Sequence, residues 1–199
     1  MTIFSKKTDQ SGRSMVEMLG VLAIIGVLSV GGISGYSKAM AKFKLTKAQD
    51  QITMLLMNIR TAYATSPSYA GLNSQIAADY NLAPNEMVNS SDHKLFGTFG
   101  GEVYVAATGG LQANTHGTSQ LTTATTGNYF YITMTALGKE ACRSLATSDW
   151  GADGFVGMVV SASGSSKSYL TADLPITLSK ITTDDLCSEE TSSITWVYY

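Results

Sequence analysis

The sequence predicts an α+β protein in which one long N-terminal helix, apolar in its first half, packs against the antiparallel β-sheet of a head. Three observations support this prediction: an apolar run near the N-terminus, an amphipathic pattern that continues it, and strand-like segments in the C-terminal two thirds. With 199 residues, of which 44% are hydrophobic and 14% charged, the chain accommodates one ordinary domain and an extension. A single long uncharged run excludes a multi-span transporter, and the apolar content excludes a wholly disordered chain.

The apolar run comprises twenty consecutive uncharged residues from Met18 to Ser37. As a helix it reaches about 30 Å, the hydrocarbon thickness of a bilayer, so it predicts a membrane-spanning segment. The alternative is a cleavable secretory signal with its cut after Gly31. We favour a retained helix, because Glu17 opens the apolar core, glycine is a weaker cleavage residue than alanine, and the helical pattern continues beyond Gly31.

An amphipathic helix continues the run. Its apolar residues recur at three- and four-residue steps and form one stripe: Leu45, Ala48, Ile52, Leu55, Leu56, Ile59 and Tyr63. Ser66 precedes a proline and predicts the end of the helix, since a residue in that position disfavours helical conformation. A continuous helix from about Ser14 to Thr65 would be roughly 78 Å long. The stripe can pack on a head, whereas the apolar first half is stable only in lipid or among copies of itself.

Residues 67–199 predict a mixed α and β head. Four segments rich in Val, Ile, Tyr or Phe predict strands: Glu102–Ala107, Tyr129–Met134, Phe155–Val160 and Ile194–Tyr199. Ala136–Ala146 predicts a short helix between the second and third of these. The Gly/Ser/Thr-rich stretches Thr108–Gly127 and Ser161–Ser168 predict surface loops.

Charge is distributed unevenly along the chain. Residues 1–66 carry a net charge of +5 and residues 67–199 a net charge of −7. An acidic head is a poor general binder of nucleic acid, because affinity for phosphate backbones comes largely from basic residues. We therefore predict no direct nucleic-acid binding.

No residue pattern typical of a catalytic or metal site appears in the sequence. His93 and His116 have no metal-ligand spacing, and the chain lacks a nucleophile elbow and a phosphate-binding loop. The segment 149–154 reads as a turn rather than a calcium loop, since most ligands are missing. The acidic pairs 184–185 and 189–190 read as solvated charges. The sequence thus predicts no enzyme, no cofactor and no metal ion.

Glu17 lies at the mouth of the apolar run, five residues after Gly12. A carboxylate at the edge of hydrocarbon is costly unless paired; taken alone, Glu17 reads as a first-turn acid in the headgroup zone that the helix dipole favours. The short polar leader ending in Gly12, the glutamate five positions later and the apolar helix together resemble the class III signal of type IV pilins and pseudopilins. The resemblance covers roughly residues 6–60, and the size of the head is similar to the type IVb group.

In that family a membrane aspartyl peptidase, the prepilin peptidase, cuts directly after the glycine and methylates the new N-terminus. The resemblance implies cleavage between Gly12 and Arg13 and N-methylation of Arg13. This sequence departs from the family pattern at Arg13, where an apolar residue is usual. The implied division of the chain is a leader (1–12), a transmembrane and filament-core helix (13–37), its amphipathic continuation (38–66), and a pilin head (67–199) with a disulfide-closed C-terminal region.

The resemblance assigns subunit registration to Glu17. Cleavage creates an α-amino cation at Arg13, which Glu17 of a neighbouring subunit can neutralise. A subunit out of step would leave both charges buried and unpaired, so this pairing fixes the axial register of a filament.

Five glycines in the same helix have two explanations. They are Gly20, Gly26, Gly31, Gly32 and Gly35. Gly31 and Gly35 form a GxxxG pair that allows close approach of helices; glycine is also common in membrane helices generally. Related filaments melt part of this helix, for which Gly26 and Gly31-Gly32 are the candidates here.

The orientation in the membrane follows from the resemblance, not from the charges. Basic residues flank the run on both sides: Lys6, Lys7 and Arg13 before it, and Lys38, Lys42, Lys44 and Lys47 after it. The positive-inside rule therefore does not favour a cytoplasmic N-terminus. By resemblance we expect a single-pass precursor in the bacterial inner membrane and then an extracellular pilus.

Cys142 and Cys187 are the only cysteines. In a domain exported to an oxidising compartment they should pair, and pilins typically close a C-terminal loop in this way. Such a bridge restricts the unfolded chain by about 4 kcal/mol in the entropy model. A free or catalytic thiol is the weaker alternative, because neither cysteine has a nearby histidine in sequence.

Taken together, these features predict a structural type IVb-like pilin that polymerises with itself. The partners implied are the prepilin peptidase, the inner membrane before assembly, and the inner-membrane assembly machinery with its ATPase. Adhesion, conjugation and motility are the roles that such a filament could serve. The alternatives are a pseudopilin or minor pilin of a secretion-like system and, from another class, a membrane-tethered binding domain that stays monomeric and keeps residues 1–12.

Overall fold

A computed structural model of the chain describes residues 11–111, 121–122, 127–151, 153–162, 165–184, 186–189 and 191–199. It divides the chain into two compact units, Met1–Phe43 and Lys44–Tyr199, which are taken separately below. Most of the predicted leader, together with His116, Asp185 and Glu190, lies outside the described residues.

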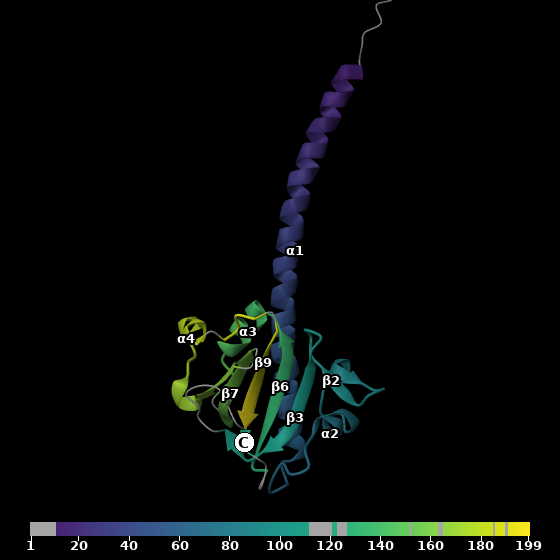
Figure 1. Cartoon of the computed structure of the whole chain (residues 1–199). Helices are drawn as coiled ribbons and strands as arrows, with labels where there is room; N and C mark the ends of the chain where they lie inside the picture. Colours follow the sequence, from purple (N-terminus) through teal and green to yellow (C-terminus); the bar gives the residue numbers. More distant parts are fainter. Residues whose placement is uncertain are drawn as a thin grey trace, which may run out of the picture. The chain divides into compact units, whose positions relative to one another are not determined.

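Helix α1 extends from Ser11 to Ala62 and contributes to both units (Figure 1). The predicted continuous helix is confirmed, and its last three predicted residues form a turn instead. In the first unit, every described side chain from Met15 to Ala39 is exposed. This helix is long enough, and its apolar window hydrophobic enough at a mean hydropathy of 2.2, to cross a membrane.

The part of α1 in the second unit carries the predicted apolar stripe. Ala48, Ile52, Leu55 and Ile59 are fully buried, and Leu45 and Tyr63 pack at the edge of the same core. The other side of the core comes from the sheet, where Ile132 and Trp196 are fully buried. The apolar stripe, which the helical periodicity places on one face of α1, therefore covers the core of the second unit.

A seven-stranded antiparallel sheet forms the body of the second unit, in the order β1-β2-β3-β6-β9-β7-β8. Its strands are β1 Val88–Asn89, β2 Lys94–Phe96, β3 Glu102–Thr108, β6 Tyr129–Leu137, β7 Phe155–Ala162, β8 Ser165–Leu170 and β9 Ser192–Tyr198. A separate two-stranded ribbon pairs β4 Gly110–Leu111 with β5 Leu121–Thr122. Figure 1 shows the C-terminal strand β9, in yellow, inserted between β6 and β7.

Short helices complete the second unit: α2 Ser74–Asp79, α3 Lys139–Ala146, α4 Leu178–Thr183, and the 3-10 turns η1 Asn85–Met87 and η2 Thr171–Asp173. Two of them begin at side-chain caps. Asn73 accepts a hydrogen bond from the amide of Ile76 (2.8 Å), and Thr177 accepts one from the amide of Lys180 (3.3 Å).

The four predicted strands are all present, and all four are longer than predicted; β9 also begins two residues earlier and ends one residue earlier than predicted. The predicted helix Ala136–Ala146 begins three residues too early, because Ala136 has φ 56° and Leu137 still pairs with Ser192 in the sheet. The predicted loop Ser161–Ser168 is wrong in its described residues: Ser161 and Ala162 end β7, residues 165–168 begin β8, and the two strands pair with Ser161 opposite Ser166. Most of the predicted loop Thr108–Gly127 lies outside the described residues.

Candidate functional site

Gly12, Arg13 and Glu17 all lie in the first turns of α1. Five residues separate Gly12 from Glu17, which is about 7.5 Å along a helix axis. The side chain of Glu17 is exposed at the start of the apolar segment. The chemistry of a carboxylate at this end of α1 is charge pairing with a cation.

The apolar surface of the first unit surrounds the helix. Its large exposed side chains are Met15, Val16, Met18, Leu19, Val21, Leu22, Ile24, Ile25, Val27, Leu28, Val30, Ile33 and Tyr36. Their exposed fractions range from 52% for Ile25 to 76% for Val27, so no other residue that the structure describes covers them. A contiguous apolar surface of this kind marks an interface with lipid or with other protein.

Within the described part of the chain, nothing packs against the five glycines of this helix. A Cβ atom added at Gly20, Gly26, Gly31, Gly32 or Gly35 would meet no heavy atom within 4 Å. The spaces beside these glycines are therefore open in one subunit. This fits both explanations that the sequence left open, since either lipid or a neighbouring helix would occupy those spaces.

Cys142 on α3 and Cys187 form the predicted disulfide, with 5.5 Å between their Cα atoms. Both cysteines are fully buried in the core. The bridge spans 45 residues and so closes one covalent loop around β7, β8, η2 and α4.

An ionic network inside this loop holds α4 to β8. Asp184, which follows α4, accepts hydrogen bonds from the Tyr169 hydroxyl (2.7 Å) and the Lys167 ammonium. Burial opposes ionisation of Asp184, but these hydrogen bonds outweigh it and lower the pKa of the carboxyl. Burial, followed by the hydrogen bond to Asp184, raises the pKa of Tyr169. Asp184 is therefore a structural anchor, and its interpretation as a solvated charge was wrong.

Sequence reasoning missed this network. Lys167 and Tyr169 are two residues apart, so in a strand they lie on one face. Their common partner Asp184 lies 15 residues beyond Tyr169, and the segment that contains Lys167 was predicted to be a loop.

A groove of about 440 Å³ lies beside α1 in the second unit. Its lining residues are Gln49, Thr53, Leu56, Met57 and Arg60 on α1, Asp149, Trp150, Gly151 and Asp153 in the loop after α3, and Tyr198 on β9. The predicted turn at 149–154 is present in its described residues, with the Asp149 carboxylate accepting a hydrogen bond from the Gly151 amide (2.9 Å). Sequence reasoning missed this groove, since Arg60 and Asp153 are far apart along the chain.

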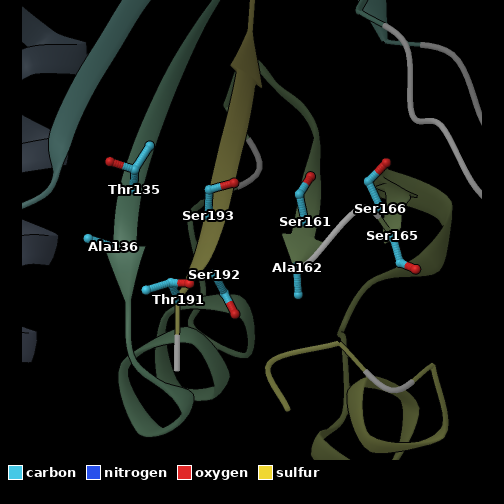
Figure 2. Close-up of a pocket in the computed structure, with 9 residues that line it drawn as sticks. All are labelled: Thr135, Ala136, Ser161, Ala162, Ser165, Ser166, Thr191, Ser192 and Ser193. Atoms are coloured by element: carbon cyan, nitrogen blue, oxygen red, sulfur yellow. The ribbon is translucent and has the colours of Figure 1, made fainter. Parts of the chain in front are cut away.

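A shallower hollow of about 410 Å³ lies at one end of the sheet (Figure 2). Its lining comes from the ends of β6 and β7 and the starts of β8 and β9: Thr135, Ala136, Ser161, Ala162, Ser165, Ser166, Thr191, Ser192 and Ser193. All nine residues are uncharged, so the hollow offers neither an acid-base pair nor a metal ligand set.

Titratable side chains elsewhere form isolated pairs. His93 Nδ1 contacts the Asp79 carboxylate at the surface, and Lys94 pairs with Glu102 at 3.3 Å. Within the part of the chain that the structure describes, no three His, Cys, Asp or Glu side chains come together as a metal site.

Comparisons with known proteins agree with one another. The family model described as Bundlin matches residues 38–196. The major structural subunit of the bundle-forming pilus of Escherichia coli O127:H6 is 30% identical over 149 residues, which cover 75% of this chain and 69% of that protein. The corresponding subunit of Escherichia coli O111:H- gives the same values. A crystal structure of a type IVb pilin from Salmonella typhi, 16% identical, covers 78% of this chain and 97% of its own, with a TM-score of 0.50.

Proposed function

Because this chain belongs to the Bundlin family, we propose that it is a structural pilin that polymerises through α1 into a type IV pilus. The observation that carries the proposal is the exposed apolar surface from Met15 to Tyr36. Identical helices of neighbouring subunits would bury this surface in a filament core. The curated relatives are major structural subunits of a pilus, and such a subunit is not an enzyme.

Processing prepares the helix for assembly. A prepilin peptidase removes the leader, residues 1–12, by cutting between Gly12 and Arg13, and methylates the new N-terminus at Arg13. The spacing of Gly12, Glu17 and the apolar run supports this step. Before assembly the precursor is anchored in the inner membrane by residues 13–37, whose apolar surface suits lipid. The assembly machinery and its ATPase then extract the subunit into the growing pilus.

Glu17 sets the register of each incoming subunit. Its carboxylate pairs with the α-amino group of Arg13 in a neighbour, inside a helix bundle of low dielectric constant. A misplaced subunit leaves both charges unpaired in apolar surroundings, which costs several kcal/mol. The glycines allow close helix contacts at the Gly31 and Gly35 pair, and Gly26 and Gly31-Gly32 are the positions where the helix can unwind.

Mass spectrometry of filaments recovered from the native host tests the processing step. We expect a chain that begins at Arg13 and carries one added methyl group on its N-terminus. A chain that keeps residues 1–12 and stays monomeric would indicate a tethered domain. A chain that begins after Gly31 would indicate a secretory signal. Either result would refute the proposed function.

The substitution Glu17→Val tests the register. We expect normal membrane insertion and loss of filaments in electron micrographs, because a neighbour's amino group then has no counter-charge. Glu17→Asp keeps the carboxylate and is the matched control, which should retain part of the filament yield. An unchanged yield with Glu17→Val would remove this role from Glu17.

A further inference from the structure

We infer that the groove beside α1 binds the segment Lys42-Phe43-Lys44 of a second copy of this chain in the filament. The inference rests on the proposed function, since it requires a filament of this subunit. It adds a specific contact between two different surfaces, the groove of one subunit and the helix segment of another.

The groove is preformed, because two contacts fix the loop after α3 against α1 and a third fixes the C-terminal residue. Gln49 Nε2 donates a hydrogen bond to Ser148 Oγ (2.7 Å). Arg60 Nη2 donates to the carbonyls of Asp153 (3.0 Å) and Tyr199 (3.1 Å). Gly154 allows this close approach, since a Cβ there would lie 1.8 Å from the same Arg60 nitrogen.

Trp150 and Tyr198 give the groove an aromatic lining. The Trp150 indole donates to the carbonyl of Leu145 (2.8 Å) and packs on Trp196, with 4.6 Å between ring centroids. Tyr198 is fully buried, and its hydroxyl has no hydrogen-bond partner within the described part of the chain. An unpaired buried hydroxyl is unfavourable, so a ligand that reaches it gains binding energy.

The rim of the groove is acidic and its wall is apolar. Asp149 and Asp153 are exposed, and neither forms an ion pair with any described residue. Met57, 55% exposed, presents an apolar side chain to the same groove. Arg60 is the cation in the lining, but its guanidinium is already engaged by two carbonyls and lies 5.6 Å from the Tyr198 ring. A ligand with an apolar centre and flanking positive charges fits this arrangement.

Lys42-Phe43-Lys44 has that chemistry. Phe43 is 62% exposed, and both lysines are exposed without an ion pair to any residue that the structure describes. Lys44 does not reach the Met57 end of the groove of its own subunit, because thirteen residues of the same helix, about 20 Å, separate it from Met57, although only five residues, about 7.5 Å, separate it from Gln49 at the near end. Only a second copy can bring the whole segment along the groove, so the segment is assigned to a neighbouring subunit.

The geometry of a filament suits such a contact. A groove on one subunit and a helix segment on another are different surfaces, and heterologous contacts of this kind propagate into open helical assemblies. Every subunit offers one groove and one basic segment, so their numbers balance. Without the leader, which carries a net charge of +1, the contact places positive charge from residues 13–66, net +4, against the acidic remainder, net −7.

Carbodiimide cross-linking of purified wild-type filaments tests the contact. The reagent joins a lysine amine to a carboxylate only where the two are in contact. Filaments assembled from mixed unlabelled and ¹⁵N-labelled subunits distinguish links between chains from links within one chain. We expect links from Lys42 or Lys44 to Asp149 or Asp153 that carry both isotopic masses. Links from these lysines to other carboxylates alone, or within single chains alone, would overturn the inference.

Charge reversal supplies an independent test. Lys42→Asp with Lys44→Asp should lower the yield of sheared filaments about tenfold, and so should Asp149→Lys with Asp153→Lys, because like charges then face each other. Combining all four changes should restore most of the yield. Asp92→Lys, at an exposed acid outside the groove, is the matched control and should leave the yield unchanged.

Failure of the four-residue combination to restore filaments, at normal membrane levels of subunit, would refute this contact alone. A wild-type chain that never forms filaments would refute the proposed function and this inference with it.

Discussion

Replacing Asp184 by asparagine should destabilise the second unit by about 2 to 3 kcal/mol. The side chain of Asp184 is 14% exposed and that of its partner Lys167 is 25% exposed, so solvent screens the pair weakly. The substitution removes the negative charge on the group that accepts hydrogen bonds from the Lys167 ammonium and the Tyr169 hydroxyl. Hydrogen bonds to a charged group contribute about 1.5 to 3 kcal/mol each, and asparagine retains part of that through its amide oxygen.

The assay is urea unfolding of the full chain in detergent micelles, followed by tryptophan fluorescence. Trp150 and Trp196 both lie in the second unit, so their emission reports the unfolding of that unit. Asp173→Asn is the matched control. Asp173 pairs with Lys180 at 3.2 Å with 43% of its side chain exposed, so its loss should cost less than about 1 kcal/mol.

Acid should remove the difference between wild type and Asp184→Asn. Folding lowers the pKa of Asp184, so its contribution is complete above the pKa of an unfolded aspartate, about 3.9, and is lost as the pH falls through the folded pKa. The two unfolding midpoints should therefore converge below about pH 4. Equal stabilities at pH 7, or a gap that persists at low pH, would show that Asp184 contributes no ionic stabilisation.

Three further predictions concern the core, the disulfide and the apolar helix. Ile52→Ala should lower the unfolding free energy by about 3 kcal/mol in the same assay because Ile52 is fully buried, whereas Met54→Ala, at a 54% exposed position, should have little effect. Cys142→Ser should lower it by about 4 kcal/mol and reduce the amount of subunit on immunoblots; normal pilus levels would show that the bridge is dispensable. Gly31→Leu should leave the amount of membrane-inserted subunit unchanged, since no atom lies within 4 Å of the new Cβ, and should reduce filament yield if the helices cross closely there.

The central strands could be predicted because their own residues determine them. β6 alternates buried and partly buried side chains along Tyr129–Leu137, and period-two alternation is visible in a single sequence. Strands β1 and β2, at one end of the sheet, were not predicted because they have only two and three residues. β8 was taken for a loop because serines dominate it; its conformation comes from pairing with β7, which composition does not reveal.

The candidate sites also differ in whether they could be predicted from the sequence. The disulfide and the exposed apolar helix follow from residue types alone, so resemblance and composition were sufficient. The Asp184 network and the groove at Arg60 depend on contacts between residues that are distant in sequence, 15 residues for Tyr169 and 93 for Asp153. A sequence motif does not show which distant residues are in contact. That prediction requires the strand register and the helix packing to be known already.

The two units differ in whether the chain itself buries their apolar side chains. In the second unit, residues from Ala48 on α1 to Tyr198 on β9 bury one another, so its core is complete within a single chain. In the first unit no comparable partner exists among the described residues: the apolar side chains are exposed and the glycines face open space. Substitutions in the first unit should therefore leave the folding of one subunit intact and alter only membrane anchoring or assembly. Substitutions in the second unit should act first on folding, except at exposed positions such as Asp149, where an effect on filaments alone would identify a contact between subunits.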